Sequence, residues 1–262
     1  VIDNGYAERV PWTLPAGPAT PRDVDPLRGV VHSKFLGRAA GHATFIAGLI
    51  HQQAPDCSTL VHLVANTEGF VDEIALVDLL TGLATQPPAD VVVLPFGGYS
   101  VKLGSFGSGP TPEDSWLDPL GLRTALARLR DAWPGTVFVA SAGNNDSSDR
   151  CFPAAFSADV DFADRVVSVA ALDAGGYRAG FSNYGTWVSA SALGVRLRSM
   201  YVIGNEHPDN DPDGPPERFR SRSFAQWSGT SFAAPLVAGR IVQTLAALRG
   251  RFGPDVTAVD AW

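Results

Sequence analysis

The sequence of 262 residues has few cysteines and no long apolar run. Only two cysteines are present, Cys57 and Cys151, and neither has a histidine or cysteine near it at the spacing of a metal site. We interpret both as free thiols and keep a disulfide between them as the alternative, so the redox compartment stays open. No apolar run approaches the roughly 20 residues that a membrane-spanning helix needs, and we expect no membrane partner.

Charge of one sign is not concentrated anywhere in the chain. The formal net charge at pH 7 is −7, the acidic residues are scattered, and lysine and arginine form no block. Nucleic acids and anionic membranes are bound by basic clusters, so we expect neither as a partner. There is no internal repeat, and we expect residues 1–262 to form a single domain.

The chain begins with Val1-Ile2-Asp3, which has the character of a strand without its first half. We therefore expect the amino end to be truncated within the first strand. Any signal or propeptide would lie upstream of Val1.

Short apolar runs alternate with segments of helical period. The expected strands are 58–65, 90–94, 136–142, 166–172 and 187–193. The expected helices are 42–53, 119–133 and 231–248. The second and third strands are apolar nearly throughout, as in a parallel sheet buried on both faces. We predict an α/β fold with a doubly wound, mostly parallel sheet and helices on both faces, whose working site lies beyond the carboxyl ends of the strands.

Four polar residues with different chemistries fall at those strand ends or at the helix starts beside them. Asp3 ends the first strand, Asn144 follows the strand 136–142, and His42 and Ser231 each open a helix after a glycine. Nucleophilic acyl transfer needs this set: a hydroxyl, an imidazole that takes its proton, a carboxylate that orients the imidazole, and donors for the oxyanion. Taken singly, each residue is an ordinary cap or turn residue, but their joint order favours a catalytic site.

The chain order Asp, His, Ser is one of three unrelated orders in which this triad occurs, and it excludes the chymotrypsin and α/β-hydrolase arrangements. Four motifs carry a resemblance that covers nearly the whole chain: Val1-Ile2-Asp3-Asn4-Gly5, Gly41-His42-Ala43-Thr44-Phe45-Ile46-Ala47-Gly48, Ala142-Gly143-Asn144 and Gly229-Thr230-Ser231-Phe232-Ala233-Ala234-Pro235. Together they resemble the subtilisin-like serine proteases, or subtilases.

The resemblance implies a serine endopeptidase in which Ser231 is the nucleophile, His42 the general base and then acid, Asp3 its orienter and Asn144 the side-chain donor to the oxyanion. It also favours a secreted protein. At a helix start the Ser231 N–H has no partner within the helix and serves as a second donor. We expect Pro235 in the first turn of that helix, where its missing N–H costs little.

Several positions depart from the family pattern. Ala43 and Phe45 differ from the residues usual beside His42, and two other departures affect hydrogen bonds. Asn4 replaces the usual hydroxyl residue beside the aspartate, so we expect different hydrogen bonds around Asp3. Pro95 begins the segment that in the family pairs with an extended substrate, and it has no N–H to donate.

By the same resemblance, the first specificity pocket has two walls and a floor. The walls are Phe96-Gly97-Gly98 and Ser141-Ala142-Gly143, and the floor lies near Cys151-Phe152-Pro153. Glycine walls and an apolar floor favour an aromatic or long aliphatic substrate side chain. The carboxylates of Asp146 and Asp149 favour a basic one instead, and this alternative stays open.

No metal site or cofactor is predicted. Asp209-Asn210-Asp211-Pro212-Asp213-Gly214 resembles the start of a calcium loop, but the twelfth position is Arg220, which cannot supply the bidentate carboxylate. Structural calcium is common in the family, with no ligands assignable here. The expected partner is a polypeptide substrate of a monomer. The alternatives are a catalytically silent binding module of the same fold, and an esterase or transferase on the same triad.

Overall fold

The computed structural model describes residues 1–7, 35–99, 119–206, 217–220 and 224–262. Within these residues the helices are α1 (His42–Gln53), α2 (Glu73–Leu83), α3 (Leu120–Ala132), the 3-10 helix η3 (Ala154–Ala158), α4 (Thr230–Phe252) and α5 (Ala258–Ala261). The strands are β1 (Ile2–Asp3), β2 (His62–Leu63), β3 (Val91–Leu94), β4 (Gly98–Tyr99), β5 (Val137–Ser141), β6 (Cys151–Phe152), β7 (Val166–Leu172), β8 (Ala190–Leu193), β9 (Leu197–Met200), β10 (Gly204–Glu206), β11 (Glu217–Phe219) and β12 (Phe224–Trp227).

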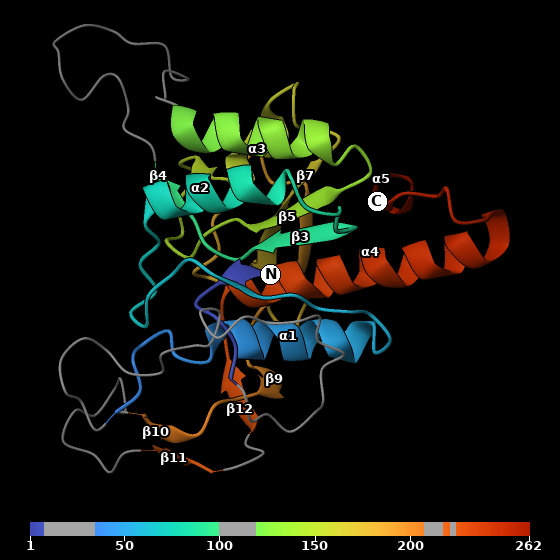
Figure 1. The fold of residues 1–262 in the computed structure, drawn as a ribbon. Helices are drawn as coiled ribbons and strands as arrows, with labels where there is room; N and C mark the ends of the chain where they lie inside the picture. Colours follow the sequence, from blue (N-terminus) through green and yellow to red (C-terminus); the bar gives the residue numbers. More distant parts are fainter. Residues whose placement is uncertain (8–34, 100–118, 207–216, 221–223) are drawn as a thin grey trace, which may run out of the picture.

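The central sheet has four parallel strands in the order β3-β5-β7-β8. Figure 1 shows α2 and α3 above this sheet and α4 and α1 below it. The predicted α/β fold, a mostly parallel sheet with helices on both faces, is therefore confirmed. Its core strands are short runs of valine, alanine and phenylalanine, which fit a pleated surface buried on both sides.

Alternate residues of β3 and of β5 belong to two different hydrophobic clusters, because successive side chains point to opposite faces. Val93 and Val139 pack with α1 and α4, whereas Val92 and Phe138 pack with α2 and α3. The sheet is thus the wall between two cores, and the site residues extend from its edge.

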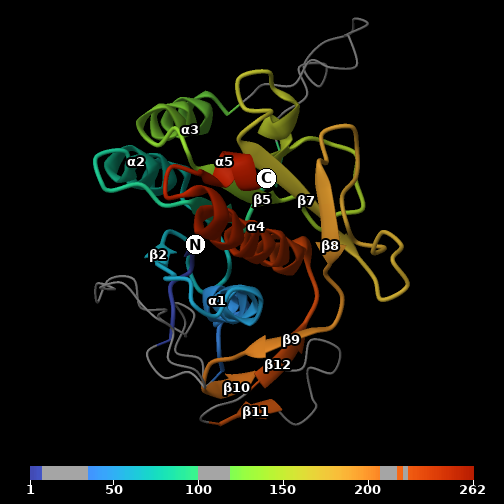
Figure 2. The same cartoon turned by 90° about the vertical axis from the view of Figure 1, so that its right-hand side faces the viewer.

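Shorter ladders extend this framework. β1 pairs in parallel with β2, β4 with β6 antiparallel, β9 with β12 antiparallel, and β10 with β11 antiparallel. Figure 2 shows β9 to β12 together below α1, away from the central sheet. The β4–β6 pair links the segment that follows β3 to the segment that follows β5 by backbone hydrogen bonds.

Most expected elements form close to their predicted bounds, but three expectations need correction. The strand expected at 58–65 is confined to β2, because its partner β1 offers only two residues. The helix α2 was not expected. The last helix begins one residue before Ser231, and Pro235 is therefore its sixth residue, inside the helix and past the first turn.

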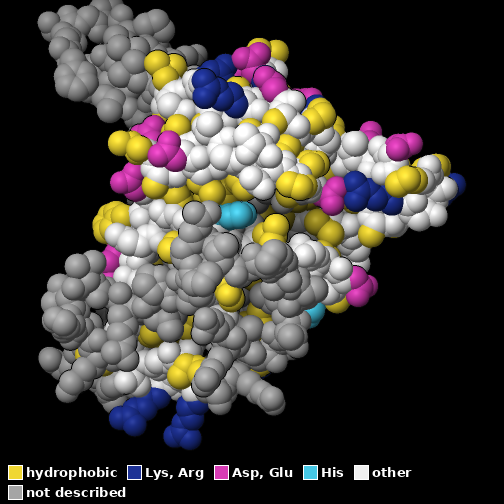
Figure 3. All heavy atoms as spheres, viewed as in Figure 1, with side chains coloured by type: hydrophobic (Ala, Val, Ile, Leu, Met, Phe, Trp, Pro, Cys, Tyr) yellow, Lys and Arg dark blue, Asp and Glu magenta, His cyan; other side chains and the backbone are white. Residues whose placement is uncertain are grey.

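The insertion expected around residues 205–221 falls partly outside the described residues. Its flanks form β10 and β11, which pair with each other, whereas the calcium-like segment 209–214 is not described. On the face drawn in Figure 3, the lysine and arginine side chains of the described residues lie in several separate groups.

Among the described residues, α4 is long and apolar enough to cross a membrane by length and composition alone, a test that the core helix of a soluble protein also passes. Half of its most apolar window is buried inside the protein, where α4 packs against α1 and the sheet.

Candidate active site

Asp3 lies at the end of β1, with its side chain 7% exposed. Its Oδ1 accepts the backbone N–H of Asn4 at 2.7 Å, and its Oδ2 lies 2.7 Å from Nδ1 of His42. A carboxylate in this position fixes the imidazole tautomer, with the proton on Nδ1 and the lone pair on Nε2.

His42 is the first residue of α1, and the glycine before it has a structural reason. Gly41 has φ 77°, in the left-handed region, and a Cβ there would meet Val202 Cγ1 at 2.9 Å. The imidazole is 16% exposed and lies 5.6 Å, edge to face, from the ring of Trp227 and 5.2 Å from that of Phe232. The aromatic rings and the carboxylate together hold the imidazole in one orientation.

Asn4, the departure beside the aspartate, is completely buried and links β1 to the start of α1. Its Nδ2 donates to the carbonyl of Ala39, and its Oδ1 accepts the N–H of Ala43 at 3.1 Å. Both bonds are to the backbone of the segment where α1 begins with His42. The side chain therefore ties the strand that bears Asp3 to the helix that bears the imidazole.

Ser231 is the second residue of α4, so its backbone N–H lies among the helix donors that have no partner within the helix. Its Oγ donates to the carbonyl of Pro95 at 2.9 Å. Among the residues that the structure describes, no hydrogen bond links this hydroxyl to His42.

Asn144 follows β5 and is held by Thr230, a residue that the sequence analysis did not single out. The Asn144 Oδ1 accepts both the N–H and the hydroxyl of Thr230, each at 2.9 Å. Both bonds use the carboxamide oxygen, so the Nδ2 amide is left as the donor group. This amide lies beside Gly229, 3.6 Å from where a Cβ on that glycine would stand.

A cleft of about 510 Å³ contains the three triad candidates. Phe96, Gly97 and Gly98 line it, as do apolar residues of the α2 and α3 region such as Leu76 and Leu122. The full lining is Asp3, Ala39, His42, Ala65, Gly69, Phe70, Val71, Glu73, Leu76, Pro95, Phe96, Gly97, Gly98, Tyr99, Pro119, Leu122, Phe152 and Ser231. A cleft with a mainly apolar lining therefore lies beside the Ser231 hydroxyl.

The second expected wall lies apart from this lining. Ser141 and Ala142 are buried, and Gly143 is half-buried. The Gly143 N–H donates to the Thr230 hydroxyl at 3.1 Å. This wall is thus hydrogen-bonded to the first residue of α4.

Both cysteines are free thiols, as the sequence analysis expected. Cys151 is 2% exposed, and burial raises its pKa to about 12. Within the described part of the chain, no group of three or more His, Cys, Asp and Glu side chains could hold a metal ion.

Comparison with known proteins gives a consistent result. A family model described as the subtilase family matches residues 31–257, a span that begins after Asp3. The thermophilic serine proteinase of Bacillus sp. (strain AK1) is 39% identical over 121 residues, which cover 46% of this chain and 23% of that protein. Thermitase of Thermoactinomyces vulgaris is 27% identical over 228 residues, which cover 83% of this chain and 65% of that protein.

Solved structures show the same fold. A cold-adapted subtilisin-like serine proteinase superposes with a TM-score of 0.65 at 19% identity, covering 99% of this chain and 77% of that one. This chain spans about a quarter of the length of the first curated relatives that it matches.

Proposed function

We propose that this chain, which belongs to the subtilase family, is a serine endopeptidase that hydrolyses peptide bonds through an acyl-enzyme. One observation supports this most: Asp3, His42 and Ser231 line a single cleft, with the Asp3 carboxylate 2.7 Å from His42 Nδ1. Most of the cleft lining is glycine and apolar side chains, which suits the binding of a polypeptide segment.

In the proposed reaction the Ser231 hydroxyl rotates away from the Pro95 carbonyl and gives its proton to His42 Nε2 as Oγ attacks the substrate carbonyl carbon. Asp3 stabilises the imidazolium that forms. His42 then protonates the leaving amine, and the acyl-enzyme remains. Water attacks this ester by the same route, with His42 again acting as base and then acid.

The oxyanion of each tetrahedral intermediate receives two donors, the Ser231 N–H and the Asn144 Nδ2 amide. Thr230 holds the Asn144 carboxamide from its oxygen side, which supports this orientation of the amide. Removing one such donor typically lowers turnover about 10²- to 10³-fold.

The test is covalent labelling with a fluorophosphonate. Wild-type protein should take up one label per chain, and Ser231→Ala should take up none. Ser191→Ala, an exposed hydroxyl on β8, is the matched control and should label fully. Labelling of Ser231→Ala, or none in any folded variant, would contradict the proposal.

A catalytically silent binding module is the second candidate. The bond from the Ser231 hydroxyl to Pro95 favours it, because this bond holds the nucleophile away from the imidazole. Cleavage of an unstructured protein by the wild type, abolished in His42→Ala, would exclude this candidate. Hydrolysis of simple esters without any cleavage of that protein would instead favour an esterase.

A further inference from the structure

The space between the two expected walls of the first specificity pocket holds the side chain of Cys151. A Cβ built on Gly97 would lie 2.4 Å from the Cys151 sulfur, and one built on Gly143 would lie 3.2 Å from it. The sulfur therefore packs against both glycines. Cys151 is only 2% exposed and is not among the residues that line the cleft, so the thiol is packed between the walls and not open to solvent.

The backbone places this thiol beside the first wall. Tyr99 pairs with Cys151 and Gly98 with Phe152 in the antiparallel β4–β6 ladder. Paired strands lie about 4.8 Å apart, so the floor strand runs directly along the wall strand. The 510 Å³ cleft accordingly touches Gly97, Gly98 and Phe152, but its lining includes none of Ser141, Ala142 and Gly143.

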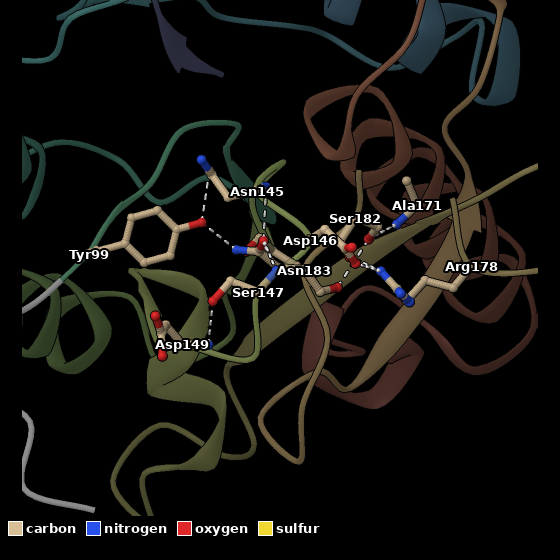
Figure 4. Close-up of polar contacts among 10 residues, drawn as sticks. Tyr99, Asn145, Asp146, Ser147, Asp149, Ala171, Arg178, Ser182 and Asn183 are labelled. Atoms are coloured by element: carbon tan, nitrogen blue, oxygen red, sulfur yellow. Dashed lines mark hydrogen bonds and ion pairs between the residues drawn. The ribbon is translucent and has the colours of Figure 1, made fainter. Parts of the chain in front are cut away.

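Tyr99, which follows the first wall, is linked to the second wall through Asn183. Its hydroxyl accepts the Asn183 Nδ2 amide at 2.7 Å and donates to Asn145 Oδ1 at 2.8 Å (Figure 4). Asn183 in turn donates from Nδ2 to the Ala142 carbonyl at 2.9 Å and from its backbone N–H to the Gly143 carbonyl at 3.0 Å. Partial burial raises the pKa of Tyr99 above its usual value, although 44% of the residue is exposed.

One of the two carboxylates that favoured a basic substrate side chain is already paired. The Asp146 carboxylate lies 2.6 Å from Arg178 Nη1 (Figure 4). This ion pair leaves Asp146 poorly placed to attract a lysine or arginine of the substrate.

From these contacts we infer that the chain cleaves after small residues (glycine, alanine or serine), with Cys151 and Tyr99 as the residues that determine this specificity. The inference rests on the proposed endopeptidase function and departs from the aromatic or long aliphatic preference that the sequence favoured. In this proposal the thiol, which packs against Gly97 and Gly143, fills the space between the walls that a larger substrate side chain would need.

The test uses peptide p-nitroanilides that differ only in the residue before the scissile bond: glycine, alanine, leucine, phenylalanine or lysine. In the wild type, kcat/KM for alanine should exceed that for phenylalanine and lysine at least 10-fold, within the range that a pocket supplies for a few methylene groups. Cys151→Gly should raise the phenylalanine-to-alanine ratio at least 10-fold. Cys151→Ser, which keeps the size of the side chain, should retain the wild-type ratio.

All rates are normalised to the number of fluorophosphonate-labelled sites, so partial unfolding of a variant does not distort the ratios. Cleavage after phenylalanine or lysine as fast as after alanine in the wild type overturns the inference and leaves the endopeptidase function standing. Absence of both label and cleavage overturns both. If Cys151→Gly fails to fold, the wild-type profile over the five peptides decides the matter.

Discussion

At the scale of the residue, the candidate site includes side chains that hold the proposed reacting groups without lining the cleft. Asn4 is the clearest of these, because both halves of its carboxamide bond to the turn before and at the start of α1. The family resemblance marked this position as a departure, but only the contacts show what the asparagine does.

Asn4→Ala should lower kcat about 10- to 100-fold with little change in KM, because small displacements of a catalytic group have effects of this size. Steady-state kinetics on a peptide with alanine before the scissile bond measures both constants. Asn4→Ser restores the hydroxyl usual in the family and tests whether a short donor can substitute. A lowered melting temperature with unchanged kcat would mean that Asn4 is structural only.

Cys151 gives a prediction about alkaline pH. Its pKa is raised by burial from 9.0 to about 12, so the folded protein keeps the thiol proton where the unfolded chain loses it. The contribution of this group to stability is therefore complete below pH 9 and is lost as the pH rises toward 12. Relative to Cys151→Ser, the free energy of unfolding of the wild type should fall by about 1 kcal/mol between pH 9 and 10.

Urea denaturation of both proteins at pH 7, 9 and 10 measures this difference. Cys57 is present in both, so its titration cancels. Parallel stability curves for the two proteins would contradict the buried, protonated thiol.

At the scale of the element, local patterns predicted most helices and core strands, and two elements, α2 and β2, differ from the prediction. The sequence signals for α2 were present: Asp72 caps the helix by accepting the Ala75 N–H at 3.0 Å, and Leu76 and Leu80 form its buried stripe. The shortness of β2 could not be read locally, because the length of a ladder depends on its partner.

Pro235 illustrates a local rule overridden by context. Proline in the sixth position of α4 leaves the Ser231 carbonyl without its usual donor four residues on. The helix continues to Phe252 nevertheless, because its buried residues pack against α1 and the sheet.

The packing of α4 on α1 gives a prediction at this scale. A Cβ on Gly239 would lie 2.6 Å from Gln53 Cβ, near the backbone of α1, where it cannot easily move. Gly239→Ala should destabilise the protein by about 1–3 kcal/mol through overpacking. Gly250→Ala, in the same helix but with no atom within 4 Å of the added Cβ, should stabilise it by about 0.5–1 kcal/mol.

Thermal or urea unfolding measures the stability of both variants. Each variant adds the same methyl group, at a crowded position in Gly239→Ala and at an open position in Gly250→Ala. Equal effects of the two substitutions would show that helix propensity alone acts at Gly239, without close contact between α1 and α4.

At the scale of the whole molecule, the triad candidates come from three elements that meet only when both cores form. Asp3 lies on β1, His42 on α1 and Ser231 on α4, and the sheet that supports them is packed on both faces. As urea is added, we therefore expect activity and tertiary structure to be lost at the same concentration.

Phe138→Ala tests whether activity depends on the core at the other face of the sheet, away from α1 and α4. Phe138 is completely buried among α2 and α3, and its truncation should cost about 3–5 kcal/mol. The urea midpoints of near-ultraviolet circular dichroism and of fluorophosphonate labelling should fall together. Phe252→Ala, 65% exposed at the end of α4, should change either midpoint little. Loss of labelling well before loss of dichroism in Phe138→Ala would show that the site melts independently.

The amino-acid sequence by itself determined which residues could do chemistry and where each would stand in its own element. These features are local: the chain order of Asp3, His42 and Ser231, the glycines before α1 and α4, and the apolar strands. Local features depend on neighbours within a few residues.

Only the tertiary structure decided what these residues touch. The Ser231 hydroxyl bonds to a carbonyl 136 positions away, and the Cys151 sulfur lies between two glycines from different strand ends. Such contacts arise when the sheet brings distant segments together, and their distances depend on packing that no local pattern encodes. The candidate residues can therefore be named from the sequence, whereas the contacts around them are set by the fold.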